Sequence, residues 1–165
     1  MIARNFVAAL TAAGQTVATA ESLTAGLISA TIASVPGASA VLRGGVVVYA
    51  TELKAVLGGV DPVVLAADGA VSEATAAQLA THIRSVTGAD WGISATGVAG
   101  PDEQEGHPAG TVFVGISSAG GTYVRRLALS GDRARIRNGV VDACLAEVLS
   151  KLGTEMGNHF DNVER

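Results

Sequence analysis

The chain has 165 residues, of which 48% are hydrophobic and only 16% are charged, and its formal net charge is −4. This length suits one compact domain with a sizeable core, and the composition excludes an intrinsically disordered chain. Only 4% of the residues are aromatic. Direct nucleic-acid binding needs a basic surface with interleaved aromatics, so we expect a small anionic ligand and no nucleic-acid partner.

Patterns for membrane insertion and disulfide bonding are missing from the sequence. No apolar run is long and uninterrupted enough to span a bilayer, and we recognise no signal peptide. The single Cys144 lies in a helical pattern and is expected to be a small buried hydrophobic residue. We therefore expect a cytoplasmic protein without a membrane partner. No pattern identifies a subunit interface, so a homodimer or higher homo-oligomer stays open.

The first half of the chain alternates helical and strand patterns. Gly14 ends the first helix, and Pro36 ends the second. Residues 45–49 form a continuous apolar run, which predicts a strand in the middle of a sheet covered on both faces. In chain order, helices are predicted over residues 2–13, 24–34, 52–57 and 62–67, and strands over residues 16–20 and 45–49.

The second half begins with a helix that Ser72 caps and that turns Leu79, Ile83 and Val86 inward. The last helix carries an unbroken apolar stripe over residues 136–152. Strands are predicted over residues 91–94, 111–117 and 122–129, the last two joined as a hairpin at Gly120 and Gly121. We therefore predict an α/β fold with one domain over residues 1–153 and a flexible tail over residues 154–165.

Two loops between the predicted elements indicate a ligand-binding site. A glycine-rich loop over residues 95–101 lies between two predicted strands, where glycine lets a backbone approach a small ligand closely. A polar cluster over residues 21–24 follows another strand and opens a helix. Together they indicate a binding site rather than two simple connections.

Several common catalytic solutions are excluded. The sequence has no Gly-x-Ser-x-Gly elbow, no Ser-x-x-Lys pair and no Walker loop. It contains only three histidines, so a Ser-His-Asp triad is poorly supported. The polar residues Asp102, Glu103, Glu105 and His107 match no defined metal-ligand spacing. We therefore expect no metal and no cofactor.

A serine and a lysine remain as candidates for catalysis. Lys54 follows the predicted strand that ends at Tyr49, so it lies near the sheet edge where α/β sites gather. A lysine withdrawn from water has a lowered pKa and can take a proton from a serine, here Ser22. The free N–H groups of the helix that follows Ser22 could stabilise negative charge there. The alternative is that Ser22 is only an N-cap and Lys54 a surface charge.

An ordered set of motifs resembles one known family. These are TAESLTAG (19–26), VPGAS (35–39), GVVVYATELK (45–54), GAVS (69–72), ATGVAGP (95–101), PAGTV (108–112) and SGDR (130–133). Together they resemble the CinA C-terminal domain family, which includes nicotinamide-nucleotide amidase. The resemblance runs from about residue 17 to residue 152 and is specific in its order rather than in any single motif.

The resemblance implies a three-layer α/β/α sandwich with a mixed, mostly buried central sheet. It implies hydrolysis of the carboxamide of nicotinamide mononucleotide (NMN) to nicotinate mononucleotide and ammonia by a serine–lysine pair, which falls on Ser22 and Lys54. Tyr49 and Thr96 are expected to support catalysis, and N–H groups near residues 22–24 or 96–97 to hold the oxyanion. The expected substrate-binding residues are Thr24, Gly26, Gly97, Gly100, Arg133 and Arg137. Phosphate binding is expected from the cluster of Arg133, Arg135 and Arg137, and the alternative for at least one of the three is a solvated helical face.

Two positions depart from the family's pattern, which often has Cys-Thr-Gly-Gly after the serine. Leu23 removes a thiol that the proposed chemistry does not need, and Ala25 replaces a glycine, so affinity or substrate choice could differ. Longer members carry an N-terminal domain with its own activity, which we do not expect here. Two other functions stay open: a non-catalytic nucleotide- or protein-binding module linked to competence, and an amidase acting on another small amide.

Overall fold

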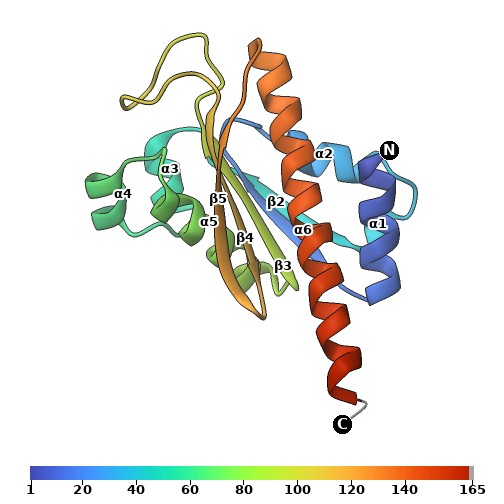
Figure 1. Cartoon of the computed structure of the whole chain (residues 1–165). Coiled ribbons are helices and arrows are strands. Elements are labelled where there is room, and N and C mark those ends of the chain that lie inside the picture. Colours follow the sequence, from blue (N-terminus) through green and yellow to red (C-terminus); the bar gives the residue numbers. More distant parts are fainter. Residues whose placement is uncertain (164–165) are drawn as a thin grey trace.

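The computed structural model describes the backbone of residues 1–163 and the side chains as far as Thr154. A mixed five-stranded sheet runs through its centre in the order β2-β1-β3-β4-β5 (Figure 1). β1 pairs in parallel with β2 and β3, whereas β4 is antiparallel to both β3 and β5. The strands are β1 (Val17–Glu21), β2 (Leu42–Val47), β3 (Trp91–Gly97), β4 (Thr111–Ser118) and β5 (Gly121–Ala128).

Helices cover both faces of this sheet, as Figure 1 shows. One layer consists of α1 (Ile2–Ala13), α2 (Leu27–Ala33) and α6 (Arg133–Val163), and the short 3-10 helix η1 (Ala38–Ala40) adjoins it. The other layer consists of α3 (Thr51–Val56), α4 (Pro62–Asp68) and α5 (Glu73–Thr87). The predicted α/β class and the three-layer sandwich are therefore confirmed.

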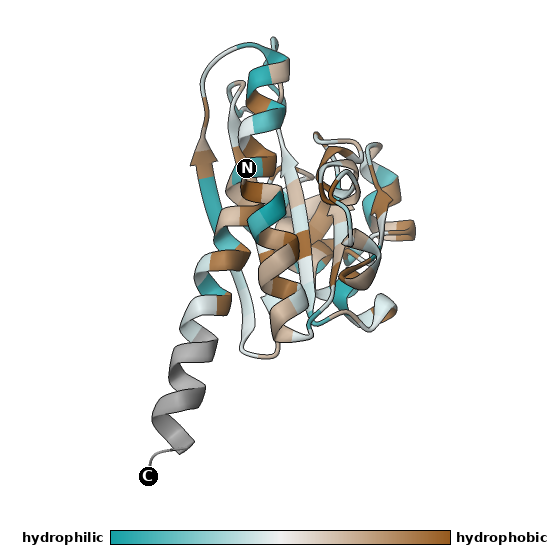
Figure 2. Ribbon diagram, turned by 90° about the vertical axis from the view of Figure 1, so that its right-hand side faces the viewer, coloured by the Kyte–Doolittle hydropathy of each residue, from teal (hydrophilic) through white to brown (hydrophobic). Residues whose placement is uncertain are grey.

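The central strands β1, β3 and β4 are buried along almost their whole length. Their side chains join those of α1, α2 and α6 in the main core, which contains Phe6, Trp91 and Leu145. Cys144 is also buried in this core, as its helical pattern predicts. Both brown and teal residues occur along the coloured part of α6 in Figure 2, as expected of a helix with one buried face.

The apolar run at 45–49 is not a central strand, and that prediction is wrong. β2 lies at the edge of the sheet, where Val46 and Val48 pack into the core while Val47 and Tyr49 are 46% and 53% exposed. A run of valines hides this two-residue alternation, because the outward and inward residues are equally apolar. Sequence alone therefore could not distinguish an edge strand from a central one.

The structure corrects the predicted helices at three further points. Val86 is 61% exposed rather than inward-facing, although Leu79 and Ile83 are buried as expected. α2 begins at Leu27 rather than near residue 24, and α6 continues to Val163 rather than ending near residue 152. The flexibility expected of 154–165 stays a prediction, since residues 164–165 and the side chains from 155 onward lie outside the described residues.

The topology brings three loops to one edge of the sheet. β1, β2 and β3 run in the same direction, so the residues that follow Glu21, Val47 and Gly97 meet at the carboxyl edge, where α/β proteins bind their ligands. Within the described part of the chain, no helix is both long enough and apolar enough to cross a membrane.

Candidate active site

The register of the parallel strands places Ser22 between two neighbours. The N–H group of Ser22 donates to the main-chain oxygen of Ala95 at 2.9 Å, and the N–H group of Val48 donates to that of Glu21 at 2.8 Å. The segments that follow β1, β2 and β3 are therefore held side by side by main-chain hydrogen bonds. Ser22 lies on the middle one.

A cavity of about 250 Å³ opens at this edge of the sheet. Seven of the predicted site residues line it together: Ser22, Tyr49, Lys54, Thr96, Gly97, Gly100 and Arg133. Its other walls come from Leu23, from Ala70 and Val71 before α5, and from the loop over residues 98–104. Residues from five separate stretches of the sequence thus converge on one small space.

Ser22 is not the N-cap of α2, which is Gly26. The first free N–H groups of this helix, those of Ile28 and Ser29, donate to the buried carboxylate of Glu21 at 3.0 and 2.9 Å. They are therefore not available to stabilise negative charge at Ser22, and that expectation is wrong. Ser22 is instead a serine in a turn, and it is 8% exposed and lines the cavity.

Lys54 is a buried lysine rather than a surface charge. Only 2% of it is exposed, and its Nζ donates to the main-chain oxygens of Val48 at 2.9 Å and Tyr49 at 3.2 Å. Burial lowers the pKa of Lys54 because a charged amine loses hydration, while the carboxylates of Glu105 and Glu52 act in the opposite direction. The amine is thereby made easier to deprotonate.

Arg133 connects the loop after β3 to the end of β2. As the first residue of α6, it donates from Nη1 to the main-chain oxygen of Gly100 at 2.8 Å and from Nη2 to the hydroxyl of Tyr49 at 2.6 Å. The guanidinium group is thus fixed at the mouth of the cavity, beside the N-terminus of a long helix. Both features favour an anion.

Arg137, Thr24 and Gly26 lie outside the residues that line the cavity. One turn along α6 from Arg133, the side chain of Arg137 donates from Nε to the main-chain oxygen of Leu23 at 3.0 Å and from Nη2 to that of Thr24 at 2.7 Å. Arg137 therefore holds the turn after Ser22 in place, and its position does not favour the predicted phosphate contact. Thr24 is fully buried, and its hydroxyl has no partner among the described residues.

Thr96 and Glu105 hold the segment before α5 from both sides. The hydroxyl of Thr96 donates to the main-chain oxygen of Ala70 at 2.6 Å. The carboxylate of Glu105 accepts the N–H groups of Ala70 at 3.1 Å and Val71 at 2.9 Å. Sequence reasoning found Thr96 but assigned no role to Glu105, which it considered only as a metal ligand and rejected on its spacing.

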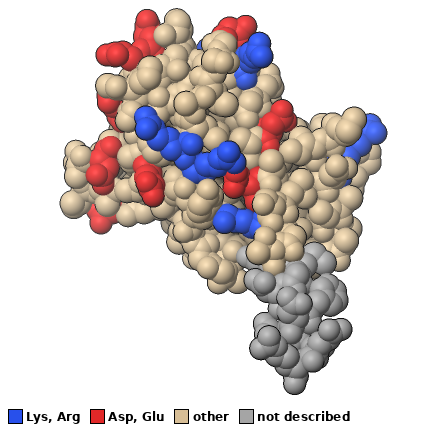
Figure 3. Space-filling model, viewed as in Figure 1, with Lys and Arg blue, Asp and Glu red and all other residues tan. Residues whose placement is uncertain are grey.

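The groups in this cavity suit nucleophilic chemistry on a small ligand. A serine hydroxyl and a buried amine supply a nucleophile and a base, and Arg133 supplies a fixed positive charge. Among the described residues, no three His, Cys, Asp or Glu side chains gather as a metal site would require. On the face drawn in Figure 3, basic and acidic side chains are interspersed without a broad basic surface.

Comparison with known proteins identifies relatives along nearly the whole chain. The family model described as the CinA C-terminal domain matches residues 1–152. A CinA-like protein of Frankia casuarinae is 52% identical over 130 residues, which make up 79% of this chain and 30% of that protein. A competence-damage inducible protein of Geobacillus sp. is 50% identical over 139 residues, which make up 84% of this chain and 33% of that protein. The chain thus spans about a third of the length of these curated relatives.

Solved structures agree with this relationship. The structure of a CinA superfamily protein from Klebsiella pneumoniae has a TM-score of 0.90 and 32% sequence identity, covering 93% of this chain and 96% of that one. The structure of a competence or damage-inducible protein from Enterobacter asburiae has a TM-score of 0.88 and 34% identity, covering 92% and 96%. On sequence and structure alike, the chain belongs to the CinA C-terminal domain family.

Proposed function

We propose that the chain is an amidohydrolase that converts NMN to nicotinate mononucleotide and ammonia through an acyl-enzyme on Ser22. The observation that carries this proposal is the buried Lys54, whose side chain shares a cavity with Ser22. A binding module without catalysis has no need for a desolvated amine beside a serine. The choice of NMN as the substrate rests on the family resemblance.

The hydrogen bonds of Lys54 fit a base. An ammonium group carries three N–H donors, whereas a neutral amine carries two and a lone pair. The oxygens of Val48 and Tyr49 accept two donors, so the neutral amine satisfies both of them and keeps its lone pair. The lowered pKa of Lys54 makes this neutral form accessible nearer to neutral pH.

In the first half of the reaction, Lys54 takes the proton of the Ser22 hydroxyl as Ser22 Oγ attacks the carboxamide carbon. The tetrahedral intermediate collapses when the ammonium of Lys54 returns that proton to the amide nitrogen, and the C–N bond breaks to release ammonia. In the second half, Lys54 takes a proton from water, which attacks the ester, and Ser22 leaves as its hydroxyl. Water thus supplies the oxygen of the new carboxylate.

The oxyanion donors are assigned to the turn after Ser22. The N–H group of Ser22 already donates to Ala95, so Leu23 and Thr24 remain in this turn, and Leu23 lines the cavity. Arg137 fixes this turn through the carbonyl groups of both residues. Preorganised N–H donors of this kind stabilise the charge that develops on a carbonyl oxygen. Arg133, held by Tyr49 and Gly100, is placed to meet the phosphate of the nucleotide.

The test is ammonia release from NMN by the wild type and by folded Ser22→Ala and Lys54→Met variants. We expect each variant to lose about 10²-fold to 10⁴-fold or more in kcat/KM. Lys151→Met is the matched control, because it removes the chain's other lysine, which lies over the Tyr123 ring far along α6. NMN binding without turnover would favour a non-catalytic nucleotide-binding module, and neither binding nor turnover would redirect the search to other amides.

A further inference from the structure

Glu105 occupies a backbone position that suits other residues better. Its φ of +52° and the φ of +75° at Gly106 lie in the left-handed region, at the centre of a tight turn between Gln104 and His107. The N–H groups of Gln104 and His107 donate to each other's main-chain oxygens at 3.0 and 2.8 Å. Turns of this kind favour glycine, asparagine or aspartate at both central positions. The presence of a glutamate there calls for a contribution from its side chain.

That contribution is visible in its hydrogen bonds. The carboxylate of Glu105 reaches across to the segment before α5, where it accepts the N–H groups of Ala70 and Val71. The backbone approaches so closely that a Cβ at Gly69 would lie 2.5 Å from Glu105 Oε2. Both Ala70 and Val71 line the cavity, and so do residues 98–104 of the loop that carries Glu105.

We propose that Glu105 is a positioning residue for the Ser22–Lys54 site, whose carboxylate ties the loop over residues 98–110 to the Gly69–Val71 segment and thereby fixes two walls of the cavity. The inference rests on the proposed function, because it takes Lys54 to be the base. Thr96 holds the same segment, because its hydroxyl donates to the main-chain oxygen of Ala70. We call the hydrogen bonds of Glu105 and Thr96 to this segment the clamp. Ala70 is thus held at both its N–H and its C=O group.

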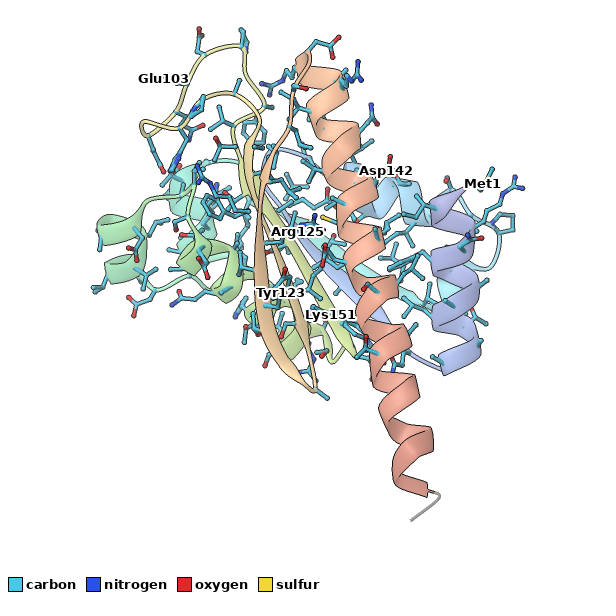
Figure 4. The ribbon with its side chains drawn as sticks, in the orientation of Figure 1. Met1, Glu103, Tyr123, Arg125, Asp142 and Lys151 are labelled. Atoms are coloured by element: carbon cyan, nitrogen blue, oxygen red, sulfur yellow. The ribbon has the colours of Figure 1, made fainter. Side chains whose placement is uncertain are left out.

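The same carboxylate acts on Lys54 through its charge. Two carboxylates raise the pKa of Lys54 against the effect of burial, and Glu105 does so more than Glu52, which lies on the helix of Lys54 itself. The other charged or titratable groups around the cavity are Asp102 and Glu103 on the loop, Tyr49 after β2 and Arg133 on α6. Figure 4 shows Glu103 on the outer part of this loop, away from the sheet. Glu105 is the acidic residue of the loop that is hydrogen-bonded to a wall of the cavity.

The chain allows a test that needs neither NMN nor turnover. It contains only two lysines, so carbon-13 labelling of the lysine Cε atoms gives two signals, and Lys151→Arg assigns them. We expect Glu105→Gln to move the titration midpoint of Lys54 to lower pH, by more than Glu52→Gln does. We also expect hydrogen exchange at the Ala70 and Val71 amides to accelerate by more than about 10-fold in Glu105→Gln and to stay unchanged in Glu52→Gln.

The Glu105→Asp variant distinguishes the effect of the negative charge from the effect of side-chain length. It keeps a carboxylate and suits a left-handed backbone, so the Lys54 midpoint should stay near that of the wild type while exchange at Ala70 and Val71 accelerates. If wild-type exchange persists at both amides in Glu105→Gln, the clamp is refuted. A Lys54 midpoint that moves no further than in Glu52→Gln refutes the electrostatic role. Failure to release ammonia from NMN would refute the proposed function alone, since both readouts remain measurable.

Where NMN is hydrolysed, the pH profile adds a third readout. The acid limb of kcat/KM follows protonation of the base in the free enzyme. In Glu105→Gln this limb should move to lower pH together with the Lys54 midpoint. A residue that only maintained the fold would lower the rate without moving the limb, and that result would contradict the proposal.

Discussion

The side-chain nitrogen of Lys54 lies 2.9 Å from the main-chain oxygen of Val48, the first residue after β2. This contact links α3 to the end of the edge strand β2, and it holds the amine in a buried position. The lysine is 2% exposed, so its charge is poorly hydrated in the folded state and well hydrated in the unfolded state. The relationship therefore couples the protonation of Lys54 to folding.

Stability should rise with pH through the titration of Lys54. Its pKa is lower in the folded state than the ordinary value of about 10.4, so between these two values the unfolded state binds more protons. The free energy of unfolding then increases with pH across this window. We expect urea denaturation of Lys54→Met between about pH 7 and 10 to show a smaller increase than the wild type. An identical slope in both proteins would contradict a buried, readily deprotonated lysine.

Arg133→Met should weaken substrate binding more than it slows the chemical step. The guanidinium group is held at the cavity mouth by Tyr49 and Gly100, and charge-assisted hydrogen bonds to a phosphate are worth about 1.5–3 kcal/mol. We expect KM for NMN to rise by about 10-fold to 100-fold. Tyr49→Phe removes one support of Arg133 and should raise KM less. Steady-state kinetics decide, and an unchanged KM in Arg133→Met would exclude the phosphate contact.

Arg137→Met should affect kcat and stability rather than KM. The side chain holds the carbonyl groups of Leu23 and Thr24 from outside the cavity, so its loss leaves two acceptors without a charged donor at a cost of about 1–3 kcal/mol. The turn after Ser22 should then lose its fixed geometry. Arg135→Met, which removes an exposed arginine from the same helix, is the control. Equal kcat values in the two variants would show that Arg137 does not support the turn.

Gly115→Ala should destabilise the fold. A Cβ at Gly115 in β4 would lie 2.5 Å from the main-chain oxygen of Ala76 in α5 and 2.5 Å from Ser94 Oγ in β3. We expect a loss of about 1–3 kcal/mol or more in the free energy of unfolding, measured by urea denaturation. Gly139→Ala is the control, because its Cβ would meet Leu129 at an ordinary 3.4 Å and alanine favours a helix by about 1 kcal/mol. Equal effects would show that α5 does not need this close approach.

The long final helix and β5 illustrate what local sequence patterns do not reveal. The stripe of apolar residues predicts α6 correctly over the core, but its polar continuation to Val163 has no such pattern. Across these elements, Lys151 Nζ lies 4.0 Å from the centre of the Tyr123 ring, and Arg125 forms an ion pair with Glu147. Figure 4 shows Tyr123, Arg125 and Lys151 where β5 and α6 lie side by side. Such pairs depend on residues that are distant in sequence.

The site shows the same division between local and long-range information. Ser22, Lys54 and Thr96 could be predicted because Ser22 and Lys54 follow strands and Thr96 lies at the end of one, and parallel strands bring their carboxyl ends together. The supporting contacts of Arg137 and Glu105 could not be predicted from the sequence. Each contact joins segments separated by more than thirty residues, and its partners are main-chain groups, which every residue carries. The edge position of β2 was missed for a related reason, since strand order is set by pairing and not by composition.

The central claim, that Ser22 forms an ester with the substrate, is tested most directly by turning over NMN in the presence of hydroxylamine. An acyl-enzyme partitions between water and hydroxylamine, so the account predicts that the hydroxamate of nicotinate mononucleotide forms at the expense of the acid. Acid-quenched protein should also carry the acyl group on the peptide that contains Ser22, and Ser22→Ala should show neither product. Ammonia release that yields only the acid at every hydroxylamine concentration, or that persists in Ser22→Ala, would contradict the account.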